Sequence, residues 1–66
     1  LLNIESTSPI KEINILNLIG QNVFSKNCQG LMLKESIEID PSLNGVYFIS
    51  IRLENNTHSL KKLILK

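Results

Sequence analysis

His58 is the only histidine in the 66-residue chain, so it offers the only imidazole that could act as a general base near neutral pH. A hydrolytic triad would need a nucleophile and an orienting carboxylate that converge on this ring. Asn56 and Thr57 precede His58 in a stretch typical of a hairpin turn, and no Gly-x-Ser-x-Gly elbow leads into a helix. The pattern therefore favours a solvated turn histidine over a catalytic one.

Side chains that could bind a metal ion are few and widely spaced. Cys28 is the only cysteine, so the chain cannot form an intramolecular disulfide. It also lies far from His58 in the sequence, so the two residues do not form a ligand cluster. Glu38 and Asp40 would share one face of a strand, but a calcium site needs six or more oxygens. We expect no metal site and no cofactor. Isolated turn glycines, which do not form a phosphate loop, stand at Gly20, Gly30 and Gly45.

The elements that would position these residues are short apolar runs separated by turn residues, which is typical of an all-β sandwich. Residues 10–19 fit either a strand, by alternation, or one face of a helix. We favour the strand, because Lys11 stands where a capping box opened by Ser8 would need Glu or Gln. Gly20, which can adopt a positive φ, would then close a tight hairpin.

The expected strands follow from the alternation. Residues 21–25 should return from the hairpin with Val23 pointing inward, and residues 26–30 should form a polar loop. The other expected segments are an opening strand at 2–6, a short pairing at Leu31 and Leu33, a strand at 36–40 that Pro41 ends, a turn at 42–45, a long central strand at 46–53 whose inner row is Tyr47, Ile49, Ile51 and Leu53, a turn at 54–57, and a last strand at 58–65.

Composition supports a small sheet protein. Leucine and isoleucine dominate the apolar residues and alanine is absent, which favours strands over packed helices. A chain of this size holds one domain and buries only about 60% of its unfolded surface. The net charge of +1 argues against nucleic-acid binding. No apolar stretch approaches the roughly 20 residues that span a bilayer, and no signal peptide is visible.

The chain begins at Leu1 rather than Met, directly in an alternating apolar segment. We therefore expect residues 1–66 to be a single domain cut from a longer polypeptide, most simply its C-terminal end. The only basic cluster is Lys61, Lys62 and Lys66. These lysines could protect an edge strand from aggregation, or they could be read by a partner.

Three segments together resemble the C-terminal sorting domain of the type IX (Por) secretion system, in its type A version. They are residues 13–23, which end in Gly-Gln-x-Val, residues 39–51, which contain Gly-Val-Tyr-Phe, and the lysine-rich end at 61–66. The family's Pro-Asn-Pro-type box before the first strand has no counterpart here. The positions that carry the family pattern are Gly20, Gln21, Val23, Gly45 and Tyr47, with Lys61, Lys62 and Lys66 as the basic end.

The resemblance implies a small immunoglobulin-like antiparallel β-sandwich of six to seven short strands, without catalytic residues. It further implies an export address that follows a cargo domain in the same polypeptide. The cargo would cross the periplasm, and outer-membrane machinery would read the folded domain through Lys61, Lys62 and Lys66. A sortase-like protease would remove the domain, leaving the cargo secreted or at the cell surface.

The alternative is an immunoglobulin-like adhesive or carbohydrate-binding module that the mature surface protein retains. In the isolated fragment, an exposed edge strand could also pair two copies.

Overall fold

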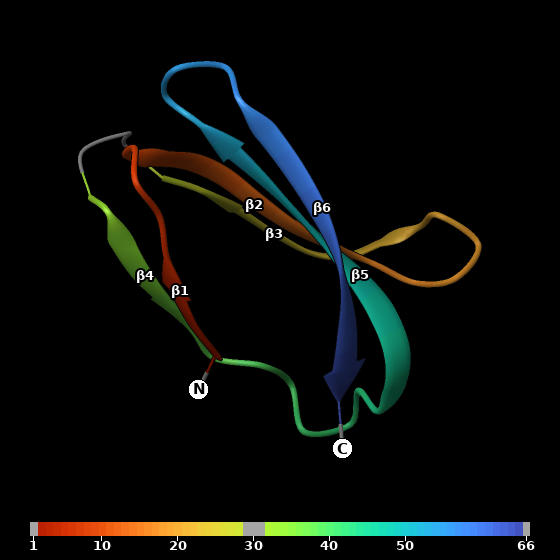
Figure 1. Ribbon diagram of the computed structural model, residues 1–66. Coiled ribbons are helices and arrows are strands. Elements are labelled where there is room, and N and C mark those ends of the chain that lie inside the picture. Colours follow the sequence, from red (N-terminus) through yellow and green to blue (C-terminus); the bar gives the residue numbers. More distant parts are fainter. Residues whose placement is uncertain (1, 29–31, 66) are drawn as a thin grey trace.

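A computed structural model describes residues 2–28 and 32–65, which form six strands and no helix (Figure 1). The all-β prediction is confirmed, and so is the assignment of a strand to the ambiguous segment at 10–19. No helix of the described residues is long and apolar enough to cross a membrane. The strands are β1 (Leu2–Glu5), β2 (Ile10–Leu16), β3 (Asn22–Asn27), β4 (Lys34–Ile37), β5 (Gly45–Leu53) and β6 (His58–Leu65).

The strands form two antiparallel sheets, in agreement with a small β-sandwich. One sheet has four strands in the order β3-β2-β5-β6, and the other has the two strands β1 and β4 (Figure 1). The pairing of β1 with β4 and that of β2 with β3 keep one register, since Leu2 opposes Ile37 and Glu12 opposes Asn27. Residues 2–28 and 32–37 therefore belong to one long hairpin that bends across the two sheets, and the β5–β6 hairpin is added alongside β2.

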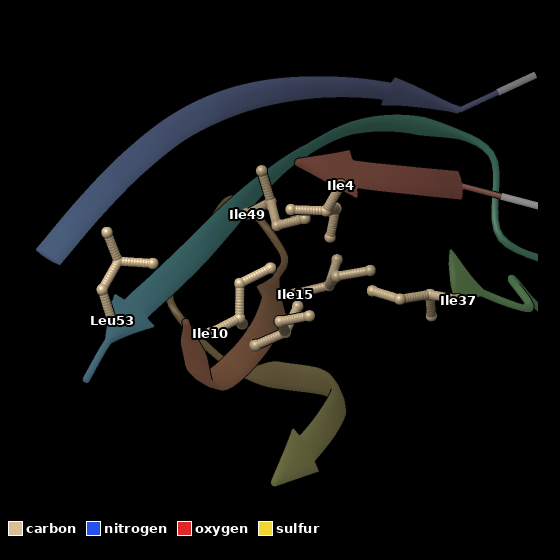
Figure 2. Packing of buried hydrophobic residues seen from close by; sticks show 7 residues of the cluster. Ile4, Ile10, Ile15, Ile37, Ile49 and Leu53 are labelled. Carbon is tan, nitrogen blue, oxygen red and sulfur yellow. The ribbon is translucent and has the colours of Figure 1, made fainter. Parts of the chain in front are cut away.

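The core lies between the two sheets and is entirely aliphatic. Ile13 and Ile15 of β2 are fully buried, because alternation points both toward the two-stranded sheet. Figure 2 shows Ile4 and Ile37 of the small sheet directed toward this cluster. Burial of each such side chain contributes about 1.5–3 kcal/mol. The buried set is Ile4, Ile10, Ile13, Ile15, Ile37, Ile49 and Leu53.

The inner row predicted for the central strand is confirmed. Ile49 and Leu53 are buried, and Tyr47 and Ile51 are partly buried and packed against the core. The tyrosine thus lies at the end of the core nearest the start of β5.

Val23 does not point inward, and that prediction is wrong. Ile15 pairs with Phe24 while the next residue, Leu16, pairs with Asn22, so Val23 is the extra residue of a β-bulge. The bulge reverses the alternation, and Phe24 packs against the core in place of Val23, which is exposed.

Several strand boundaries also differ from those expected, most of all in β3 and β4. Lys26 and Asn27 lie in β3 rather than in a loop, because β2 extends far enough to pair with them. The strand expected at 36–40 is β4, which starts earlier and ends at Ile37, where its partner β1 begins. Leu33 precedes β4, and its carbonyl accepts the Ser6 amide at 2.9 Å. Leu31 and Gly30 lie outside the described residues.

The predicted hairpin at Asn17–Gly20 is present, and a single side chain organises it. The Asn17 Oδ1 atom accepts the backbone amides of Ile19 at 3.1 Å and Gln21 at 2.9 Å. The Asn17 Nδ2 atom donates to the Gln21 side chain at 3.0 Å, and Gly20 adopts a φ of +87°. Gly20 and Gln21 therefore act in shaping this turn.

Candidate recognition site

Two basic residues of the C-terminal segment, Lys61 and Lys62, lie on β6, an edge strand of the four-stranded sheet. Lys61 is opposite Ile49 of β5, and Lys62 is opposite Phe48. Because successive side chains of a strand point to opposite faces, the two lysines cannot form one patch. Lys61 lies on the inner face, beside the small sheet, and Lys62 lies on the outer face. Lys66 lies outside the described residues.

The outer face of the β5–β6 hairpin is unusually apolar for a surface. Leu60 and Ile64 of β6 are about 60% exposed, and Val46 opposite Ile64 is also exposed. Leu60 is opposite Ser50, and the Lys62–Phe48 pair lies between the Ile64–Val46 and Leu60–Ser50 pairs. Sequence analysis missed this surface. The signal was the last strand itself, in which leucine or isoleucine occurs on both faces: Leu60 and Ile64 on one, Leu63 and Leu65 on the other.

The turns that contain Gly20 and Gly45, the two glycines of the family pattern, lie near each other in space. A hollow of about 380 Å³ is lined by the hairpin residues Asn17, Leu18 and Ile19 and by the start of β5, including Tyr47. Gly45 opens β5 with a φ of +107°, a backbone conformation that favours glycine. The two motifs therefore form one end of the sandwich, where Leu18 and Ile19 project into solvent.

The only histidine has a hydrogen-bond partner that sequence analysis did not foresee. The Ser50 Oγ atom of β5 lies 2.5 Å from the His58 Nε2 atom of β6. The carboxylate on the adjacent strand, Glu12, binds Arg52 at 3.2 Å. Among the described residues, no carboxylate hydrogen-bonds to the imidazole, so the pair does not extend to a triad. The turn predicted at 54–57 could have indicated that β5 and β6 bring Ser50 and His58 together.

The cysteine lies in a setting that suppresses thiol reactivity. Burial, followed by a hydrogen bond to Glu35 and the charge of that residue, raises the pKa of the Cys28 thiol above its ordinary value. Lys26 lies close enough to oppose this shift, but its ammonium is engaged with Glu35 at 3.2 Å. The thiol is therefore protonated near neutral pH.

The paired carboxylates of the sequence do not converge. Glu38 and Asp40 follow β4 and are exposed. The Asp40 carboxylate accepts the Ser42 amide at 2.9 Å, and this bond holds the pKa of Asp40 below its usual range. Within residues 2–28 and 32–65, no group of three or more potential ligands could hold a metal ion.

The described residues combine a lysine-bearing edge strand, an apolar outer face and a hairpin braced by Asn17. The family model of the secretion system C-terminal sorting domain matches residues 1–66. The chain belongs to this family. No match was found among curated proteins or solved structures.

Family membership confirms the resemblance noted in the sequence. A type IX C-terminal sorting signal serves export to the cell surface or the medium, as part of a longer exported chain. Such a signal acts by being recognised, which fits a domain whose distinctive residues lie on exposed strands and turns.

Proposed function

We propose that residues 1–66 are the single C-terminal sorting domain of a larger cargo protein, and that the domain has no catalytic role. In this proposal, the cargo enters the periplasm with the domain attached. The outer-membrane secretion machinery binds the folded domain, a sortase-like protease then removes it, and the cargo is released or anchored at the surface. The family match over residues 1–66 carries the proposal.

The contact with the machinery includes Lys61, Lys62 and Lys66. Lysine ammonium groups on an exposed strand remain solvated and available to a carboxylate-bearing partner. Lys62 lies among the exposed Leu60, Ile64 and Val46 side chains, so it combines a charge with an apolar surface. Interfaces of this kind bury an apolar centre and use charge at the rim to fix orientation. The positions Gly20, Gln21, Val23, Gly45 and Tyr47 act by maintaining the turns and strands that present this surface.

A secretion assay tests the proposal. The domain, with an upstream linker, is fused to a periplasm-targeted fluorescent reporter in a type IX-competent bacterium and in a secretion-null strain. We expect the reporter at the surface or in the medium of the competent strain only. Reporter retained in the periplasm of both strains, attached to a folded domain, would contradict the sorting role and favour an adhesive or carbohydrate-binding module. The intact mass of surface-located reporter then shows whether the domain has been removed.

The contribution of the basic residues needs a variant that keeps the fold. Deletion of residues 61–66 should trap the cargo, but it also removes five of the eight residues of β6 and their pairing with β5. The triple substitution of Lys61, Lys62 and Lys66 by Gln leaves the backbone pairing in place. We expect this variant to keep its melting temperature and lose most export. Normal export would exclude a role for the lysine charges.

A further inference from the structure

The two sheets of the sandwich differ in width, and this difference leaves one strand uncovered. The β4 strand lies near β3, as the ion pair between Glu35 and Lys26 at 3.2 Å shows. The β1 strand lies next to β4 and directs Ile4 toward Ile49 of β5 (Figure 2). The small sheet therefore ends above β5, and the inner face of β6 extends beyond it.

A groove runs along this uncovered face. Two hollows, of about 280 and 350 Å³, share the lining residues Glu5, Ile51 and Lys61. Ile49, Ile51 and Leu63 form an apolar floor, and β1 forms one wall. Ile49 is buried under Ile4, whereas Ile51 and Leu63 are only partly buried, so the floor stays accessible at these two side chains.

The wall formed by β1 is an open strand edge. The Ser6 amide donates to the Leu33 carbonyl, in continuation of the β1–β4 register. Since hydrogen-bonded and non-hydrogen-bonded pairs alternate in an antiparallel ladder, the N–H and C=O groups of Asn3 and Glu5 face away from β4. These groups lie at the rim of the groove, where only another extended backbone could satisfy them in register.

We propose that this groove accepts an extended segment of a partner protein, which adds to the free edge of β1 as a third strand. Neighbouring strands are about 4.8 Å apart, so a strand added there would lie above β6. Its inward side chains would contact Ile51 and Leu63 and should be apolar. One inward carboxylate should meet Lys61, which forms no ion pair with any residue that the structure describes.

The β1 strand of a second copy does not fit this role. Its inner face is already covered, since Ile4 is only 8% exposed. The inner face of β1 cannot contact the core of its own copy and the β6 strand of a neighbouring copy at the same time. The occupant must instead be a segment whose apolar face is free, as in other cases of β-strand addition.

The test uses amide hydrogen exchange and NMR titration of the chain with a defined probe. The probe is an end-blocked peptide of about nine residues in which Val alternates with Thr and one Val is replaced by Glu. We expect slower exchange at the amides of Asn3 and Glu5, and no change at Leu60 and Lys62, whose amides face the free edge of β6. A peptide N-methylated on the backbone edge that meets β1 should not bind.

The two adjacent lysines provide a matched pair of variants. Lys61→Glu should weaken binding of the Glu peptide about fivefold. Replacement of the peptide's Glu by Lys should restore the affinity for this variant. Lys62 also borders one of the two hollows, but strand alternation points its side chain to the opposite face, so Lys62→Glu should leave the affinity within about twofold. Both variants should keep the wild-type melting temperature, because both side chains are exposed.

Several results would overturn the proposal. Protection of Leu60 and Lys62 instead of Asn3 and Glu5 would place the added strand on β6. Equal effects of the two lysine substitutions, or absence of binding at millimolar peptide, would exclude a groove specific for such a strand. Protection of Asn3 and Glu5 without peptide, in a longer chain with residues upstream of Leu1, would assign the groove to that upstream segment. None of these results depends on whether the domain directs export.

Discussion

Substitution of Gly45 isolates the cost of backbone strain in this domain. The residue opens β5 with a φ of +107°, and an added Cβ atom would meet no atom within 4 Å. Any loss of stability on replacement therefore comes from the backbone conformation rather than from a steric clash. A non-glycine residue held in such a region costs on the order of 1–3 kcal/mol.

This cost is large for so small a domain. One kcal/mol lowers the melting temperature of a 60–100-residue domain by roughly 4–8 °C, so Gly45→Ala should lower it by about 5–20 °C. Gly45→Leu should behave like Gly45→Ala, since the site has open space around it. Gly45→Val should be worse and should leave the domain largely unfolded, because a β-branched side chain resists a positive φ most strongly.

Urea unfolding monitored by circular dichroism measures these differences. The midpoint should fall for the alanine and leucine variants with an unchanged slope, which indicates loss of stability without a change in the surface exposed, and the valine variant should show no cooperative transition. An alanine variant with the wild-type midpoint would refute the positive φ assigned to Gly45. A leucine variant much less stable than the alanine variant would refute the open space around it.

Three further changes test other parts of the fold. Ile13→Ala should destabilise the domain by about 2–5 kcal/mol, because it opens a cavity between the two sheets, and urea unfolding should show a chain that is mostly unfolded. Asn17→Ala should cost about 1 kcal/mol by removing the side-chain bonds that brace the hairpin, while Leu18→Ala beside it should be nearly neutral. Cys28 should react slowly with iodoacetamide near neutral pH, and unfolding in urea should accelerate the reaction. The folded state holds the Cys28 proton more tightly than the unfolded chain, so stability should fall as the pH rises past the ordinary thiol pKa of 9.0, and Cys28→Ser should abolish that fall.

Alternation in the sequence was sufficient to predict the elements of the large sheet. The row that contains Ile49 and Leu53 could be assigned because a strand of period two has only one inner face. Gly20 and Gly45 could be assigned to turns because glycine alone adopts a positive φ without strain. The all-β class and the β2–β3 and β5–β6 hairpins therefore followed from local physical rules.

The errors arose where a local rule met a non-local constraint. Val23 was misplaced because a bulge shifts the alternation, and the bulge is visible only in the pairing with β2. The extents of β3 and β4 were wrong because a strand ends where its partner ends, and the partners were unknown. The bend that divides one long hairpin between two sheets has no local signature, so the groove between β1 and β6 could not be foreseen.

The placement of Lys61 and Lys62 changes how the basic segment should be understood. In the sequence they form a pair, and a single basic patch was the natural hypothesis. In the structure they face opposite sides of one edge strand, with Ile49 and Phe48 as their respective cross-strand neighbours. A partner that contacts both must therefore wrap around the edge of β6 or bind along it. Single charge reversals consequently distinguish the two surfaces: loss of export with Lys62→Glu alone would assign recognition to the outer apolar face, and loss with Lys61→Glu alone would assign it to the groove.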